Sequence, residues 1–271
     1  MYLNFGTVLR EATGREHEVI VLDEVDSTNE EVKRRAAAGA REGLVVLSER
    51  QSAGKGRMGR RFYSPDGSGI YMSLLLRPRD IAATDMLLVT TQAAVAVAHG
   101  VSETCHVETQ IKWVNDVYYN DKKICGILTE AIADPVSGTL DAIVVGIGIN
   151  VCKPVILPEE LQDVMGFIYD NNSEKIVSRS VIAAAIIKQL LLYYEALPER
   201  VFLEEYRSRS NVIGRRIRFG TPGEVAGQPG PDWRSGRALA IDDTGGLVVQ
   251  LDDGSEEVLH TGEISLRISE K

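Results

Sequence analysis

The chain has 271 residues, of which 44% are hydrophobic and 25% are charged, and it carries a formal net charge of -9. This composition is typical of a soluble globular protein with room for one large and one small domain. The acidic balance argues against a general nucleic-acid coat and against attachment to an anionic membrane surface. The three cysteines form no C-x-x-C pair, and the first residues lack the features of a secretion signal. We therefore expect no disulfide framework, no zinc knuckle and a cytoplasmic location.

The N-terminal part predicts a strand followed by a helix. Residues 16–25 are rich in β-branched residues and bounded by polar ones, which predicts a strand. The next stretch, DSTNEEVKRRAAAG, predicts a helix in which Thr28 and Glu31 form a capping box. Ser27, Thr28 and Asn29 therefore either cap this helix or present polar groups to a ligand at its N-terminus, and on the sequence alone capping is favoured.

The most unusual stretch is ERQSAGKGRMGRR, over residues 49–61, which follows a predicted strand over residues 43–48. It holds five basic side chains against one acid, in a chain whose net charge is -9. Glycines alternate with the cations, so the backbone can approach an anion closely while Lys and Arg side chains close over it. A solvated basic turn is the alternative, but the alternation favours an anion site. The pattern GxxxxGK[ST] of a P-loop does not occur.

The rest of the chain predicts further elements. A strand ending at Pro78 is followed by a buried helix over residues 84–104. Residues 107–151 predict an antiparallel meander, because tight turns join its short strands. Residues 180–209 predict two helices. From Val212 onward, regularly spaced D-x-G and D-D-G turns predict a small all-β barrel of three or four strands.

Two short stretches of the meander could carry chemistry. The sequence IKWVND, over residues 111–116, places Lys112 next to Trp113, so the two side chains should point to opposite faces of a strand. A core-facing Lys112 would need an ionic partner, whereas a lysine on an edge strand is the simpler alternative. For Asp116 we favour a turn position. The glycines of GIGIN, over residues 146–150, mark either the close approach of a ligand or a bulge.

Other catalytic arrangements are not recognisable in the sequence. The four histidines share no motif, and no Ser-His-Asp set or pair of catalytic carboxylates can be picked out. Cys125, in the sequence KICGIL, is expected to fill space in the core rather than to act as a nucleophile.

Five stretches, in this order, resemble the biotin protein ligase family. They are STN at residues 27–29, QSAGKGRMGR at 51–60, KWVND at 112–116, KICGILTE at 123–130 and GIGINV at 146–151. The C-terminal part, with GxAxxIDxxGxL and a GEISLR ending, also resembles the SH3-like domain of that family. The resemblance implies an α+β fold. A class II synthetase-like ligase domain, with a mixed or antiparallel sheet and helices, would occupy residues 1–210, and an SH3-like β-barrel residues 211–271.

The resemblance also implies a two-step reaction. Biotin and ATP, accompanied by Mg²⁺, give biotinyl-5′-AMP and pyrophosphate. The biotinyl group then passes to a lysine of a biotin carboxyl carrier domain, such as that of acetyl-CoA carboxylase. Matched position by position, Lys112 and Arg57 are the catalytic residues. The implied biotin site comprises Ser27, Thr28, Asn29, Gln51, Lys55, Gly56, Arg57, Lys112 and Gly126. The implied nucleotide site comprises Arg60, Trp113, Asn115 and Asn150, and no residue is assigned to a metal.

Two features depart from the commonest family pattern. Lys55 stands where Arg is usual, which keeps the charge but loses the bidentate geometry. Only about 20 residues precede the first catalytic strand, too few for the helix-turn-helix of repressor members, so we expect the short class, which binds neither DNA nor membrane. The alternatives are a lipoate–protein ligase, a DNA-binding biotin sensor and a non-catalytic nucleotide-binding scaffold. The sequence does not decide the oligomeric state, a homodimer included.

Overall fold

The computed structural model describes residues 2, 4–78, 85–134, 136–170, 173, 176–221, 231–260 and 265–268. The larger sheet comprises β1 (Val19–Val25), β2 (Val45–Gln51), β3 (Gly69–Leu76), β4 (Gln110–Lys112), β5 (Asp116–Tyr119), β6 (Lys122–Ala133) and β7 (Leu140–Asn150). The smaller sheet comprises β8 (Arg216–Gly220), β9 (Arg234–Ile241), β10 (Leu247–Leu251), β11 (Glu256–Leu259) and β12 (Ser265–Ile268). The helices are α1 (Phe5–Thr13), α2 (Thr28–Ala37), α3 (Met86–Cys105), α4 (Arg179–Glu195) and α5 (Phe202–Arg209), with short 3-10 turns at Arg57–Gly59 and Glu159–Leu161.

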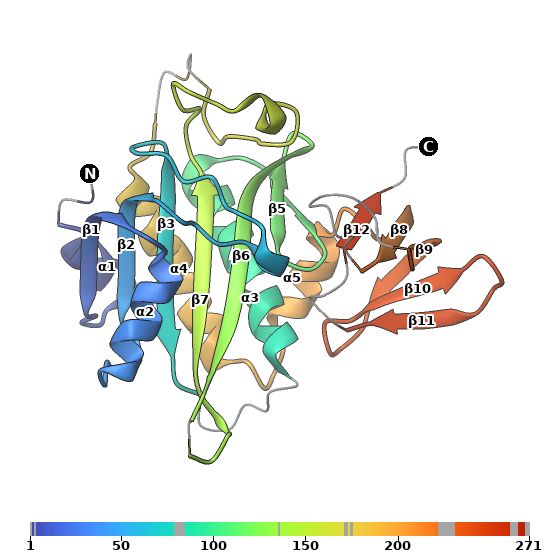
Figure 1. Cartoon of the computed structure of the whole chain (residues 1–271), viewed down its shortest axis with the longest axis horizontal. Helices are drawn as coiled ribbons and strands as arrows, with labels where there is room; N and C mark the ends of the chain where they lie inside the picture. Colours follow the sequence, from blue (N-terminus) through green and yellow to red (C-terminus); the bar gives the residue numbers. More distant parts are fainter. Residues whose placement is uncertain are drawn as a thin grey trace.

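The larger sheet is mixed. Across its described strands the order is β1-β2-β3-β7-β6-β5-β4; β1 and β2 pair in parallel, and the other neighbours pair antiparallel (Figure 1). The predicted antiparallel meander is therefore confirmed for β4 to β7. The strand predicted to reach Trp113 ends one residue earlier, because Trp113, Val114 and Asn115 form the turn into β5. This turn carries part of the predicted site.

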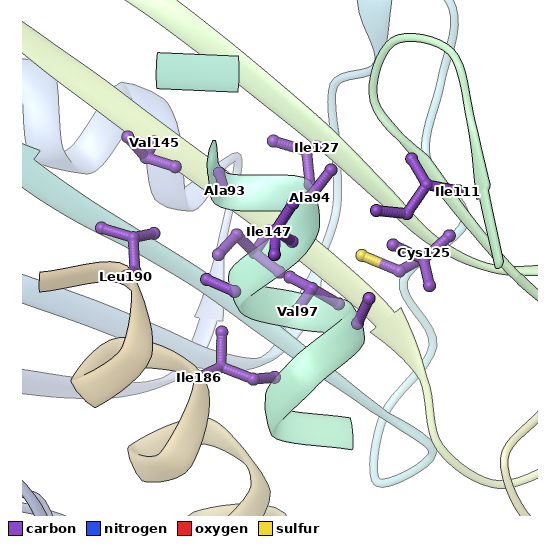
Figure 2. Close-up of a cluster of buried hydrophobic side chains, with 14 of the residues drawn as sticks. Ala93, Ala94, Val97, Ile111, Cys125, Ile127, Val145, Ile147, Ile186 and Leu190 are labelled. Atoms are coloured by element: carbon purple, nitrogen blue, oxygen red, sulfur yellow. The ribbon is translucent and has the colours of Figure 1, made fainter. Parts of the chain in front are cut away.

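Helices cover the two faces of this sheet unequally. In Figure 1, α2 lies in front of the sheet, while α3 and α4 lie behind it. The core behind the sheet is much the larger; Figure 2 shows Ala93 and Val97 of α3 close to Ile147 of β7, with Ile186 of α4 beside them. The predicted buried helix is therefore confirmed as α3, although Thr84 lies outside the described residues. Cys125 is fully buried in the same core, as expected of a space-filling residue.

Helix α1 was not predicted. It buries Phe5 and Leu9, which lie four residues apart on one face. The segment carries apolar residues at Phe5, Val8, Leu9 and Ala12, which is the spacing of an amphipathic helix, so the sequence did hold a signal for α1. Phe5 also makes an edge-to-face contact with Tyr2, with ring centroids 6.0 Å apart.

The predicted capping box at the start of α2 is wrong. Within the described residues Ser27 is the N-cap, and its side chain makes no capping hydrogen bond. The Thr28 hydroxyl instead donates to Gln51 Oε1 at 3.2 Å, and Glu31 pairs with Arg34 and Arg35. The polar side chains at this helix start are directed to tertiary partners, which removes the main argument for a purely local role.

The smaller sheet forms the predicted C-terminal β-domain, with five described strands in the order β11-β10-β9-β8-β12 rather than three or four. Part of the GEISLR ending, residues 262–264, lies outside the described residues. The turn between β9 and β10 docks on the larger sheet, because Trp113 Nε1 donates to the Gly245 carbonyl at 3.0 Å. Phe219 and Ala238 belong to the same hydrophobic core as α3, so the two sheets are packed together.

Candidate active site

Glycines take the place of side chains on the α2 face of β6 and β7. Along β7, Val144 packs under α2, and the next positions on that face are Gly146 and Gly148. Gly148 pairs directly with Gly126 of β6. A Cβ atom at Gly148 would lie 2.5 Å from Phe62 Cε1, so the Phe62 ring rests on bare backbone. The β6–β7 pairing is regular at these positions, so the glycines make room above the sheet and form no bulge.

A buried polar network borders this floor at the start of α2. The Thr28 amide donates to Gln51 Oε1 at 2.8 Å, and Gln51 Nε2 donates to Ser64 Oγ at 2.8 Å. Ser73 Oγ lies 2.8 Å from Thr28 Oγ1 and 2.6 Å from Asn29 Oδ1. Thr28 and Asn29 are almost completely buried, as is Ser27. The network fixes these side chains before any ligand binds, as an oriented hydrogen-bonding site requires.

The basic loop after β2 pairs with itself. The Gly56 amide donates to the Arg60 carbonyl at 2.7 Å, and the Phe62 amide donates to the Gly54 carbonyl at 2.9 Å. Gly54 must be glycine here, because a Cβ atom would lie 2.5 Å from the Phe62 carbonyl oxygen. The Gly56 N–H is thus used within the loop, and the loop offers its cations rather than this amide to an anion.

Arg57 joins the basic loop to the β4–β5 turn. Its Nη1 donates to Asn115 Oδ1 at 2.6 Å. Asn115 is itself fixed, since its Nδ2 donates to the Ile127 carbonyl at 2.7 Å and its carbonyl accepts from the Ile127 amide at 3.0 Å. Burial lowers the pKa of the Arg57 guanidinium, although Asp116 opposes the shift. A charge held in this way favours binding of an anion beside it.

Lys112, Asp116 and Lys123 lie at the end of the glycine floor. Lys112 pairs with Asp116 across β4 and β5, and Asp116 pairs with Gly126 across β5 and β6, so the row leads onto the glycines. Lys123 Nζ lies 2.7 Å from Asp116 Oδ1, and Asp116 begins β5 rather than standing in the predicted turn. Burial is the main cause that lowers the pKa of Lys112; nearby cations lower it further, and Asp116 opposes them.

These groups surround one cavity of about 290 Å³. It lies on the α2 face of the larger sheet, under the basic loop, and Trp233, just before β9, and Arg267 of β12 close one side. Arg267 Cζ lies 5.5 Å from the centre of the Trp233 ring. Among the described lining residues Asp116 is the one carboxylate, against seven cations: Lys55, Arg57, Arg60, Arg61, Lys112, Lys123 and Arg267. Such a cavity suits an elongated ligand with an uncharged end and an anionic end.

The structure brings the residues predicted from the sequence together, with one exception. Those that line the cavity are Ser27, Thr28, Asn29, Gln51, Lys55, Gly56, Arg57, Arg60, Lys112, Trp113, Asn115 and Gly126. Asn150 is outside the described lining: its Nδ2 donates to the Lys123 carbonyl at 3.3 Å, and its buried Oδ1 has no hydrogen-bond partner among the described residues. The adjacent Lys112 and Trp113 both reach the cavity, contrary to the opposite faces expected of a strand, because Trp113 is already in the turn.

Sequence reasoning missed several lining residues. Phe62 follows the recognised basic stretch and Lys123 is the first residue of the recognised KICGILTE stretch. Asp116 could have been placed on the face of Gly126 and Gly148 once the strand register was known. Trp233 and Arg267 come from the C-terminal β-domain, and only the packing of the two sheets brings them to the cavity. Among the described residues, no three His, Cys, Asp or Glu side chains gather as a metal cluster.

Comparisons with known proteins agree with this arrangement. Residues 21–150 match the biotin/lipoate A/B protein ligase family, and residues 212–267 match the biotin protein ligase C-terminal domain. The chain is 34% identical over 259 residues to the bifunctional ligase/repressor BirA of Bacillus subtilis, covering 92% of this chain and 74% of that protein. It is 31% identical over 252 residues to the biotin–[acetyl-CoA-carboxylase] ligase of Mycobacterium tuberculosis, covering 90% of this chain and 87% of that one.

The fold has equally clear counterparts among solved structures. The biotin protein ligase from Aquifex aeolicus, in complex with biotin and ATP, aligns with a TM-score of 0.76 and 28% identity, over 93% of this chain and 99% of that one. A glycine-floored mixed sheet with a basic loop and a small C-terminal β-domain thus defines a protein ligase, and the chain belongs to the biotin/lipoate A/B protein ligase family. Within it, the C-terminal match places the chain among the biotin protein ligases.

Proposed function

We propose that this protein activates biotin with ATP and transfers the biotinyl group to a lysine of a biotin carboxyl carrier domain. The observation that carries this proposal is that one cavity combines a glycine floor and a row of oriented polar groups with seven cations. The uncharged ring system of biotin suits the floor, and its carboxylate with the nucleotide phosphates suits the basic end. The biotin and ATP complex of the Aquifex aeolicus protein supports the same assignment.

The reaction would proceed by two displacements. A biotin carboxylate oxygen attacks the α-phosphorus of ATP, a new O–P bond forms, and the bond to the β-phosphate oxygen breaks to release pyrophosphate. The neutral amine of the carrier lysine then attacks the biotinyl carbonyl carbon, an amide C–N bond forms, AMP leaves with the electrons of the C–O bond, and the amine gives up one proton to solvent. The first step brings two anions together, so preorganised cations lower its barrier. We assign this role to Lys112 and Arg57.

The remaining site residues divide between the two ends of the cavity. Ser27, Thr28, Asn29, Gln51 and Gly126 would hold the biotin ring, with Lys55 and Gly56 above it. Lys123 is the cation nearest the floor, because its Nζ lies 3.2 Å from where a Gly126 Cβ would be, so it suits the biotin carboxylate. Arg60, Trp113, Asn115 and Asn150 would hold the nucleotide. The unpartnered Oδ1 of Asn150 could accept from the adenine amino group.

Other parts of the proposal concern the reaction's surroundings. Mg²⁺ would accompany ATP; Asp116 is the one carboxylate among the described lining residues, so phosphate oxygens and water would supply most of its ligands. We place the boundary between ligase and C-terminal domain at residues 210 and 211, next to the family match that starts at residue 212. The three cysteines are free thiols, which suits a reducing cytoplasm. None of the described helices has the length and apolar character needed to cross a bilayer.

Mass spectrometry of a purified biotin carboxyl carrier domain tests the proposal. After incubation with this protein, ATP and biotin, the carrier should gain the mass of one biotinyl group on a single lysine. Lipoate in place of biotin, tested under the same conditions, should give no gain. A lipoyl gain, or no gain with either acid, would contradict the proposal.

Replacing Gly148 by Ala should weaken biotin binding. The added Cβ would lie 2.5 Å from Phe62 Cε1, so the ring must move into the space proposed for biotin. Overpacking of this kind typically costs about 1–3 kcal/mol, or roughly 5- to 150-fold in the dissociation constant. Calorimetric titration with biotin measures the change. Gly6→Ala in α1 is the matched control, because a Cβ there meets no atom within 4 Å, and equal biotin affinity of the two variants would count against the glycine floor.

A further inference from the structure

A chain of ion pairs ties the basic loop to α2. Lys55 Nζ lies 2.6 Å from Glu30 Oε1, and Lys33 Nζ lies 3.0 Å from the same oxygen. Lys33 Nζ also lies 2.6 Å from Glu130 Oε1. The other oxygen of Glu130 accepts from Asn29 Nδ2 at 2.7 Å. The chain therefore runs without interruption from the loop to a side chain that lines the floor of the cavity.

The inner members of this chain are better shielded from water than the neighbouring Arg34–Asp26 pair. The side chains of Glu30, Lys33 and Glu130 are 28%, 29% and 25% exposed and that of Lys55 is 47% exposed, whereas Arg34 and Asp26 are 51% and 47% exposed. The hydrogen bond from Lys55 is the largest cause that lowers the pKa of Glu30, so Glu30 is ionised at neutral pH. Partly buried, connected pairs are coupled more strongly than isolated exposed ones.

The described contacts attach the loop on both sides of the cavity. On one side Arg57 is bound to Asn115 of the β4–β5 turn. On the other side Lys55 is bound to Glu30 of α2. Because the loop between Gly54 and Phe62 pairs with itself, it would move as one unit if either attachment were lost. The Lys55 ammonium is thus directed to a carboxylate of α2, where it secures the loop.

We propose that Glu30 is a positioning residue that holds the basic loop over the cavity through Lys55 and thereby prolongs retention of the biotinyl adenylate. The identity of the retained molecule rests on the proposed function, whereas the attachment of the loop through Glu30 and Lys55 does not depend on it. It also gives the lysine at position 55 a role that needs a point charge rather than a bidentate fork. Glu30 would not contact the reacting atoms.

Release of preformed, labelled biotinyl adenylate tests this role. Glu30→Gln removes the charge with little change in shape, and release should become roughly five- to tenfold faster. The rate of biotin-dependent pyrophosphate formation in a single turnover should change much less. Glu31→Gln is the matched control: Glu31 is an ion-paired, partly buried carboxylate on the same helix, but its partners Arg34 and Arg35 belong to α2 itself. This variant should release the adenylate at the wild-type rate.

The sign of the effect separates two roles of Lys55. If Lys55 instead binds the phosphate and Glu30 merely competes for it, Glu30→Gln should slow release, and that result would overturn the proposal. The double variant Glu30→Gln/Lys55→Gln should release no faster than the faster single variant, because both remove one attachment. Additive effects of the two substitutions would also overturn it.

Hydrogen exchange without ligands gives a readout that does not depend on the activity. The Gly56 and Phe62 amides, which are hydrogen-bonded within the loop, should exchange roughly five- to tenfold faster in Glu30→Gln and unchanged in Glu31→Gln. Unchanged exchange in Glu30→Gln would overturn the attachment. If the wild-type protein forms no adenylate, the proposed function fails, while this measurement still decides whether Glu30 holds the loop.

Discussion

Lys112→Ala should reduce adenylate formation by about 100- to 1,000-fold, the typical loss when one preorganised donor is removed from a reacting group. Lys112 lies on the glycine row beside Asp116, and the cations Lys123, Arg267 and Arg60 surround it, so its ammonium is held where negative charge would accumulate. Biotin binding should change much less, because the ring contacts lie elsewhere. Biotin-dependent pyrophosphate release measures the first effect, and calorimetry the second.

Two further variants make this prediction specific. Lys122→Ala removes a neighbouring lysine whose Nζ donates to the Gln162 carbonyl outside the cavity, and it should leave pyrophosphate release unchanged. Lys112→Arg keeps the charge at every pH used. Because the pKa of Lys112 is lowered, the wild-type kcat/KM should begin to fall at an alkaline pH that is lower than the ordinary pKa of a lysine. In Lys112→Arg this fall should occur at higher pH. Normal pyrophosphate release by Lys112→Ala would remove Lys112 from the mechanism.

Arg57→Ala should let the reactive adenylate escape before it meets a carrier lysine. The substitution removes the attachment of the loop to Asn115 and leaves the Asn115 Oδ1 without this donor. A lost hydrogen bond to a charged group is worth about 1.5–3 kcal/mol, so release should be roughly 10- to 150-fold faster. Free biotinyl-AMP, measured by chromatography, should rise, and lysines of bystander proteins should become biotinylated.

The control for this prediction is Arg50→Ala. Arg50 belongs to the same basic stretch, but its Nη2 pairs with Glu24 on β1, away from the cavity. This variant should retain the adenylate as the wild-type protein does. Equal retention of the adenylate by Arg57→Ala and Arg50→Ala would show that Arg57 does not slow release of the intermediate.

The sequence was most informative where local patterns determine the structure. Short strands joined by tight turns predicted the β4–β7 meander, and a long apolar run predicted α3, because both signals are local to the elements themselves. Glycines in the apolar strand β7 left either the close approach of a ligand or a bulge open; the regular β6–β7 pairing excludes the bulge, and the Phe62 ring lies over Gly148. The stretches chosen for the site converge on one cavity, since each of them projects from the same face of one sheet.

Features that depend on distant partners could not be predicted. The capping box at Thr28 is chemically reasonable in isolation, but Gln51 and Ser73 offer Thr28 tertiary partners that no local pattern reveals. Asp116 resembles a turn residue until the register of β5 on β6 places it opposite Gly126. Arg267 reaches the cavity from a sheet whose docking depends on contacts such as that of Trp113 with Gly245.

The bare glycine floor has a consequence for the enzyme at rest. At Gly126, Gly146 and Gly148 the sheet itself projects no side chain toward the cavity, and the atoms nearest these glycines belong to Asn29, Phe62 and Lys123. An occupant of the cavity would bind only the folded chain, in which these groups are brought together. Substrate occupancy should therefore raise the thermal midpoint of unfolding in proportion to the logarithm of the ligand concentration. The cellular biotin supply would then also affect the stability of the folded enzyme.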